Sequence, residues 1–519
     1  MRSTRFVLSW RFASQTNIMA FTYSLGNFRA IYLVSLCCIG SFLFAYDTGI
    51  VGGVLTLSAF QNDFRYTKAE ATSINSNCVS ILQSGAFFGC FLIWPFTARY
   101  GRRMSIVLAS FIFSLGGILQ VVNTHSIGAF YTGRVVSGFG VGAATVLVPM
   151  YSAEMAPKNM RGQLGSCFQL FFALGVCVSY WVNYAVQTRV PSSTLQWQIP
   201  IGLQLVPGGL IGLGMLLVKE SVRWLAKQGR NEEALANLIW IRGGDSPEVQ
   251  AEFEEIRSSL DEESHLTEGV SWKELLLPVN RFRVFVIITM QLGVQLTGNT
   301  SLAYYAPQIF AAVGAGNSSL FVTGFFGVVK VFSVSVFCIF VVGRIGRKTA
   351  FMGGAAAMCI LMLIIAIIVA KAPPTGQITG SSIAAIIMVY CEAASYNLSW
   401  GPVSWLYLGE IFPTRTREFG IAIGAAAQWL FNFMLSQITP HAINNLGWKT
   451  FLMFSIFNFS LVVYSFFILR ETSGKSLEEM EEVFGSKQNA IDVEASRAKA
   501  EELEAHKMDA DQTVRHVEQ

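Results

Sequence analysis

Four ionisable side chains lie deep inside stretches of the sequence that are otherwise apolar: Asp47, Arg134, Lys330 and Glu392. At the centre of a membrane helix, each such charge costs about 2.5 to 3.5 kcal/mol on the insertion scale. A charge in that position has to pair with another charge, face water or take part in function. These residues are therefore the first candidates for proton or ion chemistry. A purely structural pair between Lys330 and Glu392 is one alternative.

Amide side chains form a second group of candidates. Gln169, Gln295, Asn397 and Gln428 all occur within apolar segments. An amide offers both hydrogen-bond donors and acceptors, which suits a ligand that carries hydroxyl groups. Gln428 and Asn432 are four residues apart and would share one face of a helix. A single buried amide also commonly bonds one helix to another, so both roles stay open.

Other kinds of chemistry find no support in the sequence. All nine cysteines fall inside apolar stretches without a CxxC pair, so neither a disulfide framework nor a zinc site is indicated. There is no HExxH or GxSxG motif and no pair of catalytic carboxylates. The net charge is only +4, with no basic patch interleaved with aromatic residues. We therefore expect no metal, no cofactor, no nucleic acid partner and no enzymatic activity.

The composition places these candidates in a membrane. The chain has 519 residues, of which 52% are hydrophobic and 13% charged, with a mean hydropathy of +0.47. So few charges cannot cover that much apolar surface in water, which predicts an all-α protein embedded in a lipid bilayer. A helix needs about 20 apolar residues to cross the bilayer. The twelve predicted spans are 30–55, 73–96, 104–123, 128–150, 163–186, 197–218, 283–310, 320–343, 349–370, 380–408, 418–438 and 448–469.

A charged segment divides the chain into two halves of six spans each. Residues 220–280 contain nineteen charged residues in sixty-one, thirteen of them acidic. The spacing of apolar residues around Trp224 and Ala234 predicts short amphipathic helices here, and a solvated acidic linker is the alternative. The predicted parts are an N-terminal tail 1–29, an N-terminal half 30–219, a helical linker 220–280, a C-terminal half 281–470 and a C-terminal tail 471–519.

The distribution of Lys and Arg predicts the orientation. Ten of these residues lie in short loops on the side of the linker, against five on the opposite side. Because basic residues are enriched on the cytoplasmic side, both tails and the linker are predicted to be cytoplasmic.

An internal repeat relates the two halves. Residues 101–103 (GRR) follow the second span, and residues 346–348 (GRK) follow the eighth. The pattern E-x-x-P-x-x-x-R begins at Glu154 after the fourth span and again at Glu410 after the tenth. The alternative explanation is that these are the basic residues expected in cytoplasmic loops and that their spacing matches by chance. Duplicated halves place a substrate site near the bilayer midplane, with alternating access by rocking.

These motifs together resemble the signatures of the sugar porter branch of the major facilitator superfamily over residues 30 to 485. Residues 298–307 (GNTSLAYYAP) resemble, in finer detail, fungal permeases for quinate, galacturonate and related sugar acids. The likeness implies a plasma-membrane uptake carrier that is often proton-coupled. We expect it to function as a monomer. The motifs that carry it are Tyr46-Asp47-Thr48-Gly49, Gly133-Arg134, Pro149-x-Tyr151-x-x-Glu154-x-x-Pro157-x-x-x-Arg161-Gly162, Glu220-Ser221-x-Arg223-Trp224-Leu225, Trp400-Gly401-Pro402, Glu410-Ile411-Phe412-Pro413 and Glu471-Thr472.

The resemblance implies a role for the ionisable pair Asp47 and Arg134. These residues match the positions that form the proton site in proton-coupled sugar porters. The guanidinium keeps its charge, while a carboxylate beside it can be released to bind a proton. A structural ion pair between the first and fourth spans is the alternative.

The resemblance also implies a set of substrate contacts. Matched amides would bond the sugar, and matched tryptophans would stack on its ring. Thr300 stands where the family has an asparagine, so the ligand set for a neutral hexose is incomplete. The candidate substrate residues are Gln169, Gln295, Thr300, Lys330, Asn397, Trp400, Gln428 and Trp429.

Lys330 is the feature most specific to this chain. It lies at or beside a position where neutral-sugar porters place a sugar-contacting asparagine, and its ammonium would bind a carboxylate. The leading hypothesis is therefore a proton-coupled importer of a monosaccharide-derived acid. The alternatives are a neutral monosaccharide symporter or facilitator, and a sugar sensor that does not transport.

The loops on the cytoplasmic side carry a predicted gating network. Ala98 and Gly343 stand where the family has Asp, which predicts a weakened or replaced latch in these loops. Asn317 begins a glycosylation sequon in a predicted external loop. The predicted network residues are Arg102, Glu154, Arg161, Arg223, Arg347, Glu410 and Arg417.

Overall fold

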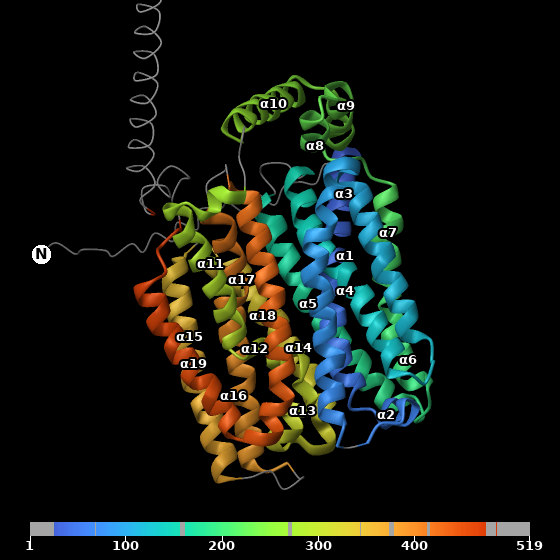
Figure 1. Cartoon of the computed structure of the whole chain (residues 1–519), viewed down its shortest axis with the longest axis vertical. Helices are drawn as coiled ribbons and strands as arrows, with labels where there is room; N and C mark the ends of the chain where they lie inside the picture. Colours follow the sequence, from blue (N-terminus) through green and yellow to red (C-terminus); the bar gives the residue numbers. More distant parts are fainter. Residues whose placement is uncertain are drawn as a thin grey trace, which may run out of the picture.

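The computed structural model describes the chain in eight pieces, and every regular element in them is a helix. Figure 1 shows two groups of long helices side by side, with the linker helices at one end of the bundle. The described residues are 25–67, 69–155, 161–267, 272–342, 344–372, 378–412, 416–473 and 484.

The first half supplies six spans from seven helices. One of them, α3, contains both the second and the third predicted span, and Gly101 breaks its helical geometry with φ 89° and ψ 175°. A positive φ of this size is accessible mainly to glycine. The helices are α1 (Leu25–Val54), α2 (Ser58–Phe64), α3 (Ala71–Val121), α4 (Ile127–Met155), α5 (Arg161–Arg189), α6 (Leu195–Leu203) and α7 (Leu205–Leu216).

The second half contains two broken spans. The seventh is interrupted at Gly298, which has φ 90°, and the tenth at Ser399 between two helices. Broken helices are a feature of transporters, because the freed backbone ends can face a binding site. The elements are α11 (Pro278–Leu296), α12 (Asn299–Tyr304), α13 (Ala306–Phe310), η3 (Ala311–Ala315), η4 (Gly316–Ser318), α14 (Ser319–Val336), η5 (Phe337–Val341), α15 (Arg347–Lys371), α16 (Gly380–Asn397), α17 (Trp400–Glu410), α18 (Arg417–Leu446) and α19 (Lys449–Phe467).

The prediction of twelve spans is confirmed. Nine helices in the described residues are long and apolar enough to cross a membrane. The helix α3 holds two spans, and the broken seventh and tenth segments supply the remaining two. The protein is therefore an all-α membrane protein with six spans in each half.

The linker is helical, as its apolar spacing predicts, rather than a purely solvated segment. Trp224, Leu225 and Leu238 are buried in a core shared with the first half. An ion pair of 2.7 Å between Arg242 and Glu252 joins the second linker helix to the third. The linker elements are α8 (Val222–Lys227), α9 (Asn231–Arg242), α10 (Pro247–Thr267) and η2 (Trp272–Leu276).

The two halves are bonded to each other at the end away from the linker. Four described hydrogen bonds cross between them there, whereas the described ion pairs at the linker end each join residues of one half or of the linker. The structure is thus closed at the far end. The crossing bonds are Gln308 Nε2 to Gly52 O (3.0 Å), Tyr180 Oη to Ala303 O (2.6 Å), Gln437 Nε2 to Asn77 Oδ1 (2.7 Å) and Asn444 Nδ2 to Thr72 Oγ1 (2.6 Å).

Candidate functional site

The structure brings Asp47 of α1 and Arg134 of α4 together in the core of the first half. Arg134 Nη1 donates to Asp47 Oδ1 over 2.6 Å, and Arg134 Nε donates to the carbonyl of Cys78 over 2.9 Å. Their side chains are at most 1% exposed. Asp47 Oδ2 has no hydrogen-bond partner among the described residues. The pair therefore balances two buried charges while leaving one carboxylate oxygen available for a proton.

Glycines hold Arg134 at this position. A Cβ atom at Gly138 would lie 2.3 Å from the carbonyl oxygen of Leu82, and one at Gly142 would lie 2.0 Å from that of Ala86. Only glycine allows α4 and α3 to pack this closely, as small residues commonly do between membrane helices. The close packing of α4 on α3 brings the Arg134 guanidinium to the Cys78 carbonyl.

Lys330 and Glu392 lie in the second half, on the neighbouring helices α14 and α16. Lys330 is 6% exposed and Glu392 is fully buried. The Lys330 ammonium lies 5.1 Å from the ring centroid of Phe326 and has no hydrogen-bond acceptor among the described residues. Glu392 Oε2 accepts from Asn299 Nδ2 over 3.0 Å. The two charges are near enough to attract each other but do not form an ion pair.

Two of the predicted substrate-binding amides have side-chain atoms without a hydrogen-bond partner among the described residues. Gln295 is fully buried, and neither of its side-chain polar atoms has a partner among the described residues. Gln428 Oε1 is likewise unpartnered. Gln169 in α5 and Thr300 in α12 are half-buried. Because buried polar groups are nearly always bonded, these amides fit positions that a polar ligand would satisfy.

The other predicted substrate residues make contacts within the protein. Trp400 Nε1 donates to the carbonyl of Phe351 over 2.9 Å, and their rings are 4.8 Å apart. Asn397 Nδ2 donates to the carbonyl of Ala393 over 2.7 Å. Trp429 Nε1 reaches Thr145 Oγ1 of the first half at 3.4 Å. These three side chains are engaged in packing in this state.

Residues outside the predicted set complete the buried polar core. Asn299 bonds Glu392, and Tyr304 Oη accepts from Asn432 Nδ2 at 3.4 Å. Gln83 and Gln291 are fully buried, and their amide atoms have no hydrogen-bond partner in the part of the chain that the structure describes. The signal that identified Gln295, an amide within an apolar run, also applies to Gln83 and Gln291.

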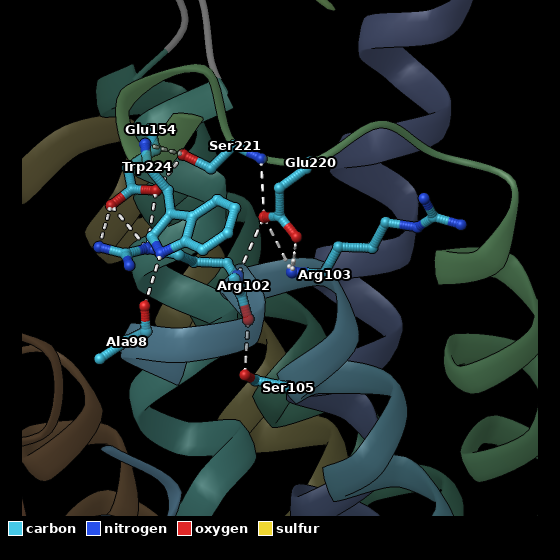
Figure 2. A network of polar contacts seen from close by, with 9 residues as sticks. Ala98, Arg102, Arg103, Ser105, Glu154, Glu220, Ser221 and Trp224 are labelled. Atoms are coloured by element: carbon cyan, nitrogen blue, oxygen red, sulfur yellow. Dashed lines mark hydrogen bonds and ion pairs between the residues drawn. The ribbon is translucent and has the colours of Figure 1, made fainter. Parts of the chain in front are cut away.

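At the linker end, the first half carries the predicted network around Arg102. Figure 2 shows Arg102 Nε directed at both carboxylate oxygens of Glu154, each at 3.2 Å. Ser221 Oγ also donates to Glu154. Trp224 Nε1 donates to the carbonyl of Ala98 over 3.3 Å. At Ala98, one of the two positions where the family has Asp, the contact is thus a hydrogen bond from an indole to the backbone carbonyl.

Glu220 caps the start of the third span within this network. Its carboxylate accepts from the backbone N–H of Arg102 at 2.9 Å and of Arg103 at 3.1 Å. A Cβ at Gly101 would lie 2.4 Å from Glu220 Oε2, so the glycine makes room for the cap. Burial raises the pKa of Glu220, while its backbone hydrogen bonds and Arg102 act to lower it. Anionic caps of this kind stabilise helix N-termini.

The second half repeats this arrangement. Arg347 Nη2 bonds Glu410 at 3.1 Å, and Thr472 Oγ1 donates to Glu410 at 2.6 Å. Glu471 accepts from the backbone N–H of Arg347 at 2.7 Å and of Lys348 at 3.1 Å. The repeat seen in the loops thus extends to Glu220 and Glu471.

The structure describes only some of the remaining residues that the sequence predicted as part of the network or as the glycosylation site. The side chain of Arg161 and the whole of Gly343 lie outside the described residues. Arg223 lies in α8, Arg417 begins α18, and Asn317 lies within η4 between α13 and α14.

Twelve membrane helices in two halves enclose buried charges and amides that have no partner among the described residues, which defines a polytopic membrane carrier. The profile of the family described as sugar (and other) transporter matches residues 33–484. The chain therefore belongs to this family, the sugar porters of the major facilitator superfamily.

Relatives and solved structures agree with this assignment. The chain is 34% identical over 480 residues to a probable quinate permease of Aspergillus fumigatus, covering 89% of this chain and 88% of the relative. It is 33% identical over 476 residues to the quinate permease of Emericella nidulans, covering 89% of each. The proton:xylose symporter XylE bound to 6-bromo-6-deoxy-D-glucose aligns with a TM-score of 0.72 and 26% identity, over 88% of this chain and all of that one. The inward-open XylE of E. coli gives 0.73 and 27%, over 88% and 99%. These relatives are transporters, not enzymes.

Proposed function

We propose that this protein imports a monosaccharide-derived acid, quinate-like or galacturonate-like, together with protons by alternating access. The observation that carries the proposal is Lys330, a buried cation on α14 without a hydrogen-bond acceptor among the described residues. An ammonium in such a site favours an anionic ligand, since a neutral ring needs no cation there. The similarity to quinate permeases supports this class of substrate.

Proton coupling would offset the charge of the proposed substrate. Carrying a monoanion into a cell against an inside-negative potential costs about 2.3 kcal/mol per 100 mV, and one symported proton cancels that charge movement. Asp47 is the proposed proton carrier, because it is buried beside Arg134 and its Oδ2 accepts no hydrogen bond from any described residue. Lys330 would then bind the carboxylate of the substrate, and Asp47 would carry the proton.

The remaining candidates would contact the body of the substrate. Gln295, Gln428, Gln169 and Thr300 offer hydrogen bonds to hydroxyl groups. Trp429 bonds across the halves in the present state, so it is proposed to exchange this contact for the substrate when the halves move.

The experiment that tests the proposal is labelled uptake in cells that lack their own transporters. Wild type and Lys330→Asn are given quinate, galacturonate, glucose and xylose at two pH values. We expect Lys330→Asn to lose acid uptake and to keep or gain neutral-sugar uptake. Unchanged acid uptake by this variant, at normal surface level, would disprove the role of Lys330.

A neutral monosaccharide symporter is the second candidate. The observation in its favour is the structural similarity to the proton:xylose symporter XylE. Uptake of glucose or xylose by wild type, with no uptake of either acid, would select it. A sensor would show sugar-dependent signalling without uptake of any of the four compounds.

The proposal also specifies the membrane in which the protein lies and its orientation in that membrane. Both tails, the linker and the loop network of Arg102 and Arg347 would face the cytoplasm of a plasma-membrane protein that works as a monomer. Asn317 would then be external and open to glycosylation. A shift in electrophoretic mobility after glycosidase treatment of wild type, absent in Asn317→Gln, would support this orientation.

A further inference from the structure

The relation between Glu392 and Lys330 is unusual for two buried opposite charges. They lie on packed helices, α16 and α14, and attract each other electrostatically. Opposite charges in a low-dielectric interior normally meet directly, since pairing offsets the cost of burial. Here, Glu392 instead accepts a hydrogen bond of 3.0 Å from the Asn299 amide.

Asn299 is held in place by the break in the seventh span. It is the first residue of α12 and follows Gly298, whose φ of 90° turns the chain. The amide of Asn458 on α19 donates to the carbonyl of Thr297 over 3.0 Å, which fixes the backbone just before the break. Asn299 itself is 1% exposed. Its amide direction is therefore determined by the backbone geometry rather than by a flexible loop.

We propose that Asn299 is a positioning residue that holds the Glu392 carboxylate away from Lys330, so that the Lys330 ammonium stays open to the carboxylate of the substrate. This inference rests on the proposed function. Glu392 balances the charge of Lys330 at a distance, while a direct contact would make it an internal competitor of the substrate. Asn299 thus determines the affinity for carboxylate-bearing substrates without touching them.

The test is a double-mutant cycle with the labelled acid, quinate or galacturonate, that wild type transports. Asn299→Ala frees Glu392 to pair with Lys330, so the KM for the acid should rise about tenfold, as expected for loss of a hydrogen bond to a charged group, with little change in maximal rate. Asn299→Ala combined with Glu392→Gln removes the competitor and should restore a KM close to that of wild type. Rescue of this kind is not expected if Asn299 serves only to hold α12.

Asn458→Ala is the matched control. Asn458 is as deeply buried and bonds the same region of backbone, but its described hydrogen bonds go to the carbonyls of Thr297 and Phe454 and not to Glu392. Glu392→Gln should lower the KM of Asn458→Ala by no more than it lowers the KM of wild type, whereas it should lower the KM of Asn299→Ala by more. An unchanged KM in Asn299→Ala, or a raised KM that Glu392→Gln does not restore, overturns the inference.

Two further measurements separate the possible failures. If Asn299→Ala does not reach the membrane, Glu392→Gln alone decides: it should lower the KM for the acid, and a KM that is not lowered overturns the inference. Lys330→Asn is measured in the same assay. Acid uptake unaffected by Lys330→Asn defeats the proposed function itself, whereas loss of uptake in Lys330→Asn with an unchanged KM in Asn299→Ala defeats only the role of Asn299.

Discussion

The Asp47 side chain is the residue on which the proposed proton coupling depends. Asp47→Asn keeps an oxygen that can accept from Arg134, so we expect the variant to fold and reach the membrane. The amide cannot bind and release a proton, so pH-driven accumulation of substrate should be lost. Exchange of substrate down its own gradient should survive. Accumulation and exchange are measured separately with labelled substrate.

Asp63→Asn provides the control for this prediction. Asp63 lies at the far end of the bundle, where its carboxylate accepts from Trp197 Nε1 over 2.7 Å. It is an acid with a buried aromatic partner but without an arginine, so accumulation should persist in Asp63→Asn. Full uphill uptake by Asp47→Asn at normal surface expression would show that Asp47 is not the coupling group.

The family resemblance predicted the pairing of Asp47 with Arg134, but the sequence did not predict which of the buried amides have partners within the protein. An apolar run identifies Gln295 and Asn397 equally well as buried amides. The structure separates them, because Asn397 bonds the carbonyl one turn earlier in its own helix and Gln295 has no described partner. Trp400 is likewise packed on Phe351. Such differences depend on the rotation of each helix in the bundle, which short apolar windows do not determine.

At the level of whole helices, the composition of the sequence predicted the lengths of the spans. It did not predict where two of the spans are interrupted. Twelve apolar runs of about the thickness of a bilayer are visible in any hydropathy count. Gly298 and Ser399 look like other residues of such runs, and only tertiary contacts show that the seventh and tenth spans are divided there. The caps Glu220 and Glu471 also escaped prediction as caps, because each acts on a helix more than one hundred residues earlier.

The Glu220 cap should contribute measurably to stability. Glu220→Ala removes an acceptor for the backbone N–H groups of Arg102 and Arg103, which should cost about 0.5 to 2 kcal/mol, as for other helix caps. Glu220→Gln keeps one acceptor oxygen and should cost less. The melting temperature of the purified protein in detergent measures both, and Glu471→Ala is the equivalent change in the other half. Equal melting temperatures for Glu220→Ala and wild type would contradict the cap.

The cap also predicts a direction of pH dependence. Burial raises the pKa of Glu220 above its ordinary value of 4.5 in the folded protein. Because the pKa of Glu220 is higher in the folded than in the unfolded protein, proton binding favours the folded state. The stability that this protonation provides is fully present below pH 4.5 and is lost as the pH rises through the folded pKa. Glutamine cannot ionise. The difference in melting temperature should therefore shift in favour of Glu220→Gln as the pH rises, and a shift in favour of wild type would contradict the prediction.

Besides Glu471 and Thr472 at its start, the described part of the C-terminal tail contains a further anchor, Phe484. Its ring is 8% exposed and lies 5.3 Å from the Arg283 guanidinium and 5.4 Å from that of Arg470. Cation–π contacts of this kind contribute about 0.5 to 2 kcal/mol each. Truncation after Phe484 should therefore leave transport and melting temperature close to wild type, whereas Phe484→Ala in the full chain should lower the melting temperature.

Phe484→Leu is the matched variant for this anchor, because it keeps apolar volume and loses the ring. An intermediate melting temperature is expected. Truncation after Phe484 that abolishes transport would show that the later tail has a structural role. Loss of sugar-dependent signalling with transport unchanged would instead favour the sensor.

For the molecule as a whole, the hydrogen bonds between the halves define one conformation of the carrier, and the proposed alternating access requires a second. Each half has its own network at the linker end, centred on Arg102 and Arg347. Described hydrogen bonds between the halves are concentrated at the opposite end, where α1 contacts α13 and α3 contacts α18. Rocking of one half against the other would have to break those far-end bonds before substrate could enter from that face.

This requirement can be tested by cross-linking the far end. Thr72 on α3 and Asn444 on α18 bond across the halves over 2.6 Å. A disulfide between cysteines at these two positions should hold the far end closed, so uptake should fall on oxidation and return on reduction. Ser58 and Ser192 are the control, because their hydroxyls are 3.3 Å apart at the same end but within one half. Oxidation of the Ser58→Cys, Ser192→Cys variant should leave uptake unchanged. Undiminished uptake by the fully cross-linked Thr72→Cys, Asn444→Cys variant would mean that the far end does not open during transport.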